Sequence, residues 1–204
     1  MNGGSRMQYL KEEIKKRILI AALDEFKEKG YLSASVRNIA SNADTALGTV
    51  YKYFRNKEDL FNSVVESVYS DLFATINKII VADVNPNEKL IEIKNRILDI
   101  FKGNSKEVLI LFGKSKGSKY ENFKNEVVDV LHNIIQKEIF SRFEDKSIVK
   151  EPFIFYVLST NFVEGLYTIL KTQEDGEKIS ILIDQLMFFS FHGTESRFKE
   201  MSHI

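Results

Sequence analysis

Cysteine is absent from this 204-residue chain, which excludes disulfide bonds and metal sites built on thiolates. A reducing cytosol is a suitable setting for such a chain. No apolar run approaches the roughly 20 residues that span a bilayer, and the first residues lack the apolar core of a signal peptide. We therefore expect a soluble, cytoplasmic protein with no membrane partner.

An excess of one charge is also lacking, since 29 Lys and Arg residues balance 29 Asp and Glu residues. The distribution of charge is more informative than the total. Residues 1–60 hold 11 basic residues against 8 acidic ones. Between Ser33 and Lys57 the only acid is Asp44, and the bases are Arg37, Lys52, Arg55 and Lys57. A local basic patch of this kind is typical of a surface that contacts phosphates.

Proline is scarce, and both prolines, Pro86 and Pro152, fall at expected helix starts, so no expected helix is interrupted. Asn56 and Asn85 have the positions of N-caps. Apolar spacing predicts an all-α fold of about nine helices without strand pairs. The expected ranges are about 8–29, 35–41, 47–54, 57–81, 86–102, 106–114, 121–143, 152–172 and 176–193.

Two short helices with a tight break between them stand out in residues 33–57. Val36, Ile39 and Ala40 form the inner face of the first helix, and Val50 and Phe54 form that of the second. The outer face of the second helix carries Thr49, Lys52 and Tyr53, with Tyr51 nearby. Hydroxyl, amine and aromatic groups at this spacing suit phosphates and base edges in a DNA groove.

The same residues carry a family resemblance. Gly48-Thr49-Val50-Tyr51-Lys52-Tyr53-Phe54 and then Asn56-Lys57-Glu58-Asp59-Leu60 resemble the DNA-binding signature of the TetR (tetracycline-repressor) family. The resemblance implies a flexible tail at 1–10, an N-terminal three-helix DNA-binding domain at 11–71 with its helix-turn-helix at about 34–53, and a C-terminal helical ligand-binding and dimerisation domain at 72–204. It also implies a sequence-specific transcriptional repressor, released from its operator by a small, mainly apolar inducer.

The expected DNA contacts come from both helices. Arg37 would reach a base edge or phosphate, and Ser35 and Lys57 would hold phosphates of double-stranded DNA. The recognition helix would use Thr49, Tyr51, Lys52 and Tyr53. Asp44 and Ala46 depart from the family pattern of a glycine and a capping serine, and Leu47 stands where a polar residue often faces a base. Asp44 can still take a left-handed turn, and Asp44 or Thr45 could supply the cap.

The last two long helices are apolar on more than one side, with 12 of 18 residues apolar in 153–170 and 9 of 13 in 179–191. A helix that is apolar on several sides must bury several sides. We therefore expect a two-fold homodimer, which would suit an inverted-repeat operator, while a central helix in a monomer is the alternative. The expected interface residues are Phe162, Leu166, Leu182, Leu186 and Phe189.

A ligand pocket in the C-terminal region is implied by the resemblance and partly supported by the residues. Aromatic residues exceed what a minimal core needs, and two polar residues interrupt an apolar helix, as the orienting groups of a pocket would. A plain aromatic core with solvent-facing polar residues is the alternative. The candidates are Phe101, Phe112, Phe123, Phe155, Tyr156, Asn161, Glu164 and Tyr167.

Motifs for catalysis or metal binding are weak. Gly113-Lys114-Ser115 lacks the second glycine of a phosphate-binding loop, because position 108 is valine. Asp129 and His132 are spaced like a metal pair but have no second pair. We expect no metal, no cofactor and no enzymatic activity. Two other functions stay open: a helical small-molecule-binding protein or enzyme that has lost DNA binding, and a structural DNA-binding protein without an inducer.

Overall fold

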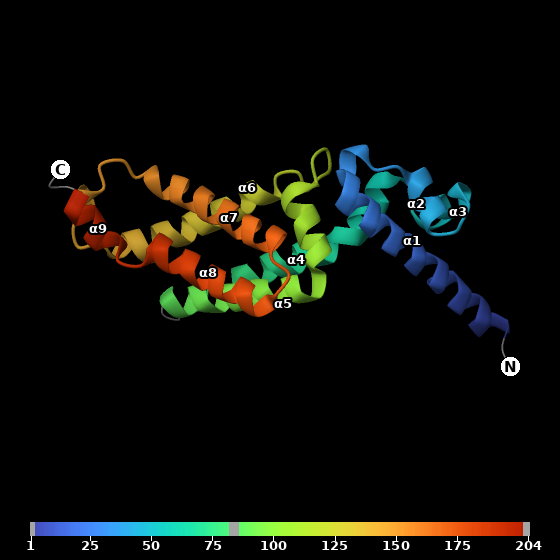
Figure 1. Ribbon diagram of the computed structural model, residues 1–204, viewed down its shortest axis with the longest axis horizontal. Helices are drawn as coiled ribbons and strands as arrows, with labels where there is room; N and C mark the ends of the chain where they lie inside the picture. The colour runs from blue at the N-terminus through green and yellow to red at the C-terminus, as the bar shows by residue number, and fades with distance from the viewer. Residues whose placement is uncertain (1–2, 82–85, 202–204) are drawn as a thin grey trace. The chain divides into compact units, whose positions relative to one another are not determined.

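The computed structural model describes residues 3–81 and 86–201, with the side chains of residues 8–79, 88 and 91–201 (Figure 1). Within these ranges every regular element is helical, which confirms the predicted all-α class. No helix among the described residues is both long and apolar enough to cross a membrane. The expected N-cap Asn85 lies outside the described residues.

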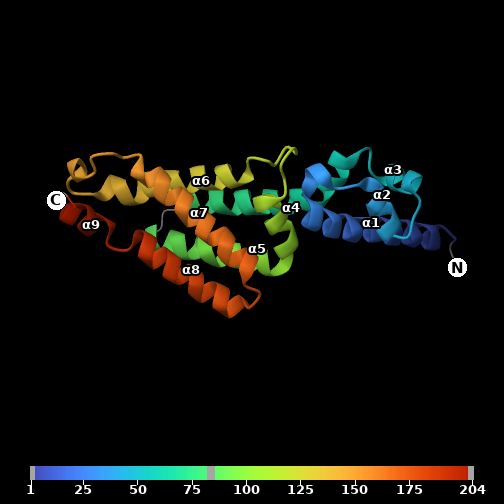
Figure 2. The ribbon, with the colours of Figure 1, turned by 45° about the horizontal axis from the view of Figure 1, so that its top comes forward.

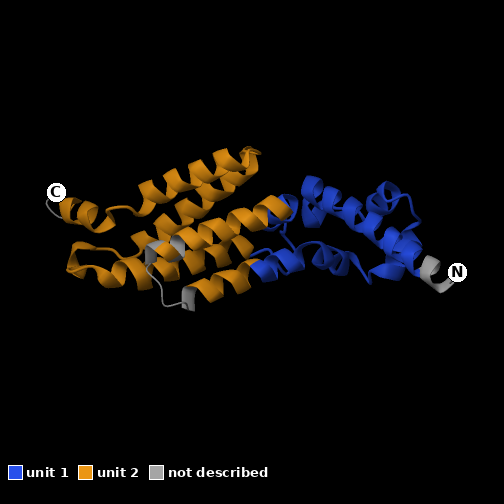
Figure 3. Cartoon of the chain, turned by 90° about the horizontal axis from the view of Figure 1, so that it is seen from below, with its two compact units in different colours: residues 1–71, 104–122 blue, residues 72–103, 123–204 orange. Residues whose placement is uncertain are grey.

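The chain forms two compact units (Figure 3). Unit 1 contains residues 1–71 and 104–122, and unit 2 contains residues 72–103 and 123–204. The sequence predicts a domain boundary after residue 71 and places residues 104–122 in the C-terminal domain, whereas these residues belong to unit 1. Division into an independent DNA-binding domain and an independent ligand-binding domain stays a prediction.

Unit 1 begins with α1 (Gly3–Ser33). Its buried stripe of Ile18, Ala22 and Phe26 repeats every four residues and packs into the core of the unit. The helix begins at Gly3 rather than near Gln8, so part of the expected tail is helical. Gly30 breaks the helix with a φ of 75°, as the sequence predicted, because glycine accepts this left-handed conformation without strain.

Two short helices, α2 (Val36–Asn42) and α3 (Leu47–Tyr53), follow α1. Next comes α4 (Lys57–Val81), which belongs to unit 1 as far as residue 71. The predicted N-cap of α4 is confirmed, since Asn56 Oδ1 accepts a hydrogen bond from the Asp59 N–H at 2.8 Å. The helix α2 packs against both α1 and α3 (Figure 2).

Residues 104–122 complete unit 1. They include the end of α5 (Pro86–Gly113), which is interrupted at Asn104, where the sequence predicted a break. Lys114 accepts a hydrogen bond from the Tyr31 N–H through its carbonyl at 2.8 Å, and the Lys106 ammonium lies 2.6 Å from the Asp24 carboxylate. Lys119 forms a third link, to Glu66 at 2.9 Å. This segment is therefore attached to both α1 and α4.

Unit 2 is built from the last part of α4, the first part of α5, and α6 (Phe123–Ile134), α7 (Ile154–Thr172), α8 (Gly176–Phe191) and α9 (Thr194–Met201). The helix α6 packs against α7, and α7 packs against α8 (Figures 1 and 2). The central helix α7 buries Phe155, Val163, Leu166 and Leu170.

Two helix ends in unit 2 differ from the prediction. The expected helix 121–143 is regular only as α6, which gives way to a π-helical turn at Ile135–Ile139 and a 3₁₀ turn at Phe140–Arg142. Packing of the Phe140 ring 5.0 Å from that of Phe155 accompanies this change. The expected last helix ends at Phe191, and α9 follows after Gly193, which has a φ of 64°.

Candidate DNA-binding surface and ligand cavity

A buried carboxylate fixes α2 against α1. Glu25 on α1 is 5% exposed, and its Oε1 accepts hydrogen bonds from the Ser35 N–H at 3.0 Å and the Asn38 amide at 3.4 Å. The Ser35 hydroxyl in turn accepts from the Asn38 N–H and caps α2. Ser35, expected to hold a phosphate, thus has a capping role in the free protein. Glu25 was not among the residues predicted from sequence, although an acid three residues after Ala22, on the buried face of α1, is a usable signal.

The turn between α2 and α3 accommodates the unusual Asp44. Its φ is 49°, so it takes the left-handed conformation that was expected of it. The expectation that Asp44 or Thr45 would cap α3 is wrong, because the N-cap residue is Ala46 and has no side-chain capping bond. The Arg17 guanidinium lies 3.8 Å from the Asp44 carboxylate, which is fully exposed. This pair is weak in water but partly offsets the negative charge next to α3.

The helix α3 has two distinct faces. Val50 is 1% exposed and Phe54 is also buried, so these two side chains anchor the helix in the core of unit 1. Tyr51 is 49% exposed and Lys52 is exposed beside it, while Thr49 and Tyr53 are half-buried. These four side chains lie on the helix that follows the turn, and the exposed Arg37 lies on the neighbouring α2. The fold thereby keeps them on two helices in contact.

Gly48 on α3 is exposed, and a Cβ added there would meet no other atom within 4 Å. The packing of the free protein therefore does not require glycine at this position. Glycine also weakens a helix relative to alanine. Its presence is consistent with the close approach of another molecule to α3.

Lys57 is held by the protein itself. Its ammonium donates to the carbonyl oxygens of Leu32 at 3.1 Å and Ala34 at 3.3 Å, and lies 4.9 Å from the centre of the Tyr31 ring. The sequence predicted only a phosphate contact for this cation. In the structure, Lys57 also links the start of α4 by hydrogen bonds to the segment that connects α1 with α2.

Arg55 and Asp59 stabilise the connection between α3 and α4. The Arg55 N–H donates to Asp59 Oδ2 at 2.9 Å, and the guanidinium lies 3.3 Å from Asp59 Oδ1. The backbone hydrogen bond, followed by the side-chain hydrogen bond from Arg55, holds the pKa of Asp59 below its usual value. Arg55 thus has a carboxylate partner within the protein.

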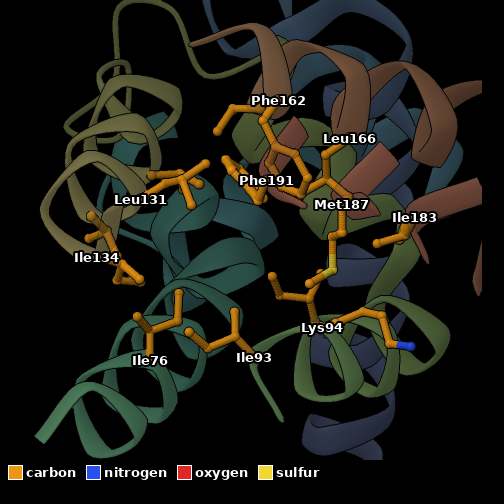
Figure 4. A pocket seen from close by; sticks show the side chains of 14 residues that line it. Ile76, Ile93, Lys94, Leu131, Ile134, Phe162, Leu166, Ile183, Met187 and Phe191 are labelled. Carbon is orange, nitrogen blue, oxygen red and sulfur yellow. The ribbon is translucent and has the colours of Figure 1, made fainter. Parts of the chain in front are cut away.

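Unit 2 contains a cavity of about 60 Å³ between α4, α5, α6, α7 and α8 (Figure 4). Its wall is formed by aliphatic side chains, Met187, the rings of Phe162 and Phe191, and the stem of Lys94. Lys94 directs its nitrogen away from the cavity, toward Asp184, whose carboxylate lies 2.6 Å away. The wall is therefore almost wholly apolar and suits a hydrocarbon group.

None of the eight residues expected to bind a ligand lines this cavity. Phe123 and Phe155 are fully buried in aromatic packing, and Phe101 and Phe112 are also buried. The aromatic rings pack against one another, for example Phe73 on Phe123 at 6.0 Å, and leave the cavity wall to aliphatic residues. Ligand binding by the aromatic set Phe101, Phe112, Phe123, Phe155, Tyr156 and Tyr167 stays a prediction.

The two polar candidates on α7 also point elsewhere. Asn161 and Glu164 are exposed, and the Glu164 carboxylate lies 2.9 Å from the Lys124 ammonium. The Tyr167 ring lies 4.7 Å from the same ammonium. These residues form a charged and aromatic surface of α6 and α7, away from the cavity wall.

Four of the five predicted interface residues are at least half-buried in the single chain. Phe162 and Leu166 line the cavity, Leu182 is half-buried, and Leu186 packs against Gly165, where an added Cβ would lie 3.0 Å from Leu186 Cδ2. Phe189 is instead 73% exposed. Ile181 and Phe188 on α8 are also exposed, at 50% and 56%, so this helix presents an uncovered apolar face. The sequence counted these two residues as apolar without assigning them to the interface.

Comparison with known proteins finds a family match in the N-terminal part of the chain. Residues 18–64 match the family described as bacterial regulatory proteins, tetR family. The regulator PksA of Bacillus subtilis is 24% identical over 143 residues, which cover 69% of this chain and 68% of PksA. The repressor KstR of Mycobacterium tuberculosis is 35% identical over 78 residues, covering 38% of this chain and 36% of KstR. The fatty acid metabolism regulator protein of B. subtilis is 30% identical over 88 residues, covering 43% and 45%. The chain thus spans less than half the length of these last two relatives.

Solved structures resemble a larger part of the chain. A TetR-like transcriptional regulator from Rhodococcus sp. RHA1 has a TM-score of 0.63 at 14% identity, covering 86% of this chain and 93% of that one. The B. subtilis regulator FadR, solved in complex with stearoyl-CoA, has a TM-score of 0.54 at 19% identity, covering 88% and 98%. At these identities the similarity establishes the fold alone.

Proposed function

Since the chain belongs to the TetR family of bacterial regulatory proteins, we propose that it is a transcriptional repressor that a small, mainly apolar ligand releases from DNA. It is a regulatory protein and not an enzyme. The proposed active form is a homodimer in the cytoplasm, bound to an inverted repeat in double-stranded DNA. The observation that carries this proposal is the exposed face of α3 on a firmly anchored helix-turn-helix.

DNA recognition is assigned to α3 and the adjoining part of α2. Lys52 and Tyr51 have the exposure needed to reach base edges, and Thr49 and Tyr53 flank them. Arg37 adds a cation from α2, and Lys57 adds one at the start of α4. Anchoring by Val50 and Phe54 supports this assignment, because a recognition helix must keep its orientation to discriminate between base pairs.

The homodimer is supported by the uncovered face of α8. Ile181, Phe188 and Phe189 are large apolar side chains on one helix, and each is at least half exposed in the single chain. Their burial against a second copy would remove a substantial apolar area from water. Two copies related by a two-fold axis would present two recognition helices to the two halves of an inverted repeat.

Regulation by a ligand is supported by the cavity and by the way α4, α5 and α6 lead along the chain from the cavity to unit 1. Ile76 on α4 lines the cavity, and the same helix begins at Lys57, shortly after the recognition helix ends. The cavity-lining helix α5 continues into residues 104–122, and the cavity-lining helix α6 begins directly after them. Residues 104–122 are attached to α1 and α4. A ligand would act by binding more tightly to the chain conformation that is unsuited to DNA.

The proposal is tested by selecting DNA from a random library with the full-length protein and measuring affinity by gel shift. We expect an inverted-repeat consensus, and we expect Lys52→Ala to alter that consensus. Lys150→Ala, a matched loss of an exposed lysine in unit 2, should leave the consensus and the affinity unchanged. Failure to select any sequence would favour a helical binding protein that has lost DNA recognition.

A further inference from the structure

A wide groove adjoins the apolar cavity in unit 2. It has a volume of about 620 Å³ and is lined partly by charged and polar residues, including Glu138, Arg142, His192 and Ser196. Met187 and Phe191 line both the groove and the cavity. The two spaces are therefore neighbours, separated by the side chains of two residues on α8.

We infer that the cavity and the groove together accept an unbranched acyl compound, with its hydrocarbon tail in the cavity and its polar head in the groove. This inference rests on the proposed function for its regulatory meaning and names the chemical class of the ligand. The shared chemistry is an acyl chain long enough to reach from the cavity into the groove. A free fatty acid and an acyl thioester are two sources of that chain.

The volumes favour a molecule that occupies both spaces. A water needs about 10–15 Å³ of such cavity volume, so about 60 Å³ accommodates about five water- or methylene-sized groups in the cavity. The groove is about ten times larger. A compound confined to the cavity would be very small, whereas a chain that continues past Met187 and Phe191 can place its remaining atoms and its head group in the groove.

The shape of the wall favours a linear chain. Ile183, Met187 and Phe191 follow one another at four-residue intervals on α8, and Val127, Leu131 and Ile134 form a similar row on α6 (Figure 4). Residues spaced in this way lie along one side of a helix. The cavity between these rows holds only about five methylene-sized groups, so a single hydrocarbon chain fits it better than a wide fused-ring molecule.

The two shared residues suit a passage between the spaces. Met187 is half-buried, and methionine is a flexible, apolar side chain that adapts to a chain passing beside it. Phe191 packs against Phe162, with ring centres 5.1 Å apart, on the cavity side. Ile183 lines the cavity one helical turn of α8 beyond Met187, so a tail that passes Met187 would reach it.

The test is calorimetric binding of saturated fatty acids from six to sixteen carbons to the full-length protein without DNA. Each buried methylene should raise the affinity by about fourfold, so dodecanoate should bind at least tenfold more tightly than hexanoate. Ile183→Phe should shorten the cavity and weaken dodecanoate binding at least tenfold. Ile20→Phe makes the same change at an exposed position of α1 in unit 1 and should stay within twofold of the wild type.

A second variant covers the possibility that Ile183→Phe does not fold. Met187→Trp narrows the passage and should also weaken dodecanoate binding, and its indole fluorescence can be followed without background because the chain has no other tryptophan. Wild-type dodecanoate affinity in whichever of these variants folds would overturn the inference. Tighter binding of cholate, a fused-ring amphiphile, than of any acyl chain would do the same.

Dodecanoate and dodecanoyl-CoA identify the source of the acyl chain. Both should lose affinity in the Ile183→Phe protein, and the tighter of the two identifies the head group that the groove prefers. A gel shift with each compound then tests the regulatory role separately. Release of DNA by some other compound without any acyl binding would overturn this inference alone, whereas acyl binding that leaves DNA affinity unchanged would overturn the regulatory part of the proposed function alone.

Discussion

Replacement of Gly48 by alanine should stabilise the protein and weaken its binding to DNA. In the free protein the new methyl group would meet no atom within 4 Å, so no packing opposes it. Alanine is better than glycine in a helix by roughly 0.5–1 kcal/mol, because glycine loses more backbone freedom on folding. The free energy of unfolding should rise by up to about this amount.

The corresponding thermal shift is small but measurable. For a chain of 204 residues, 1 kcal/mol raises the unfolding midpoint by about 2–4 °C. In the complex with DNA, the same methyl group would lie between α3 and the groove of the DNA. If the backbone of α3 contacts DNA at Gly48, the helix must move back, and we expect at least a tenfold loss of affinity, or about 1.4 kcal/mol.

Scanning calorimetry would measure stability, and fluorescence polarisation with a labelled operator would measure affinity. Gly103→Ala is the matched control, since Gly103 is also helical and exposed, has no atom within 4 Å of an added Cβ, and belongs to unit 2. It should stabilise the protein without changing DNA affinity. A Gly48→Ala protein that binds DNA as tightly as the wild type would refute the reasoning, because the close approach of DNA to α3 would then be absent.

Lys57→Ala should lower the free energy of unfolding by about 1–2 kcal/mol in urea titrations, since it removes charge-assisted hydrogen bonds to the carbonyls of Leu32 and Ala34. The same variant should reduce the slope of log DNA affinity against log salt concentration by about one, and an unchanged slope would show that Lys57 has only a structural role. Phe189→Glu should convert the dimer to a folded monomer in sedimentation, because Phe189 is largely exposed in the single chain; a wild-type protein that is already monomeric at micromolar concentration would contradict the dimer. Asp59→Asn should lower the free energy of unfolding at neutral pH, because it removes the negative charge that Arg55 stabilises. The difference in free energy between the two proteins should vanish as the pH falls through the lowered pKa of Asp59, below its ordinary 3.8, because the wild-type carboxylate then loses its charge as well. Urea titrations of both proteins at several pH values would show this, and a difference that persisted in acid would rule out the carboxylate charge as its cause.

Local signals determined much of this protein. The cap at Asn56, the breaks at Gly30 and Asn104, and the stripe of Ile18, Ala22 and Phe26 each depend on residues within a few positions of one another. The same applies to α3, whose buried Val50 and exposed Lys52 follow from helical spacing. Such features can be read from sequence because capping and amphipathic packing act over one or two helical turns.

Tertiary structure alone decided which side chains meet across the chain. Lys57 finds its carbonyl partners at Leu32 and Ala34, more than twenty positions earlier in the sequence, so no local pattern indicated them. Phe162 and Leu166, whose place in a dimer interface stays a prediction, also line the cavity, because five helices together enclose that space. An apolar side chain has no direction of its own in the sequence, and its place in a core, a cavity wall or an interface is set only when the surrounding helices pack.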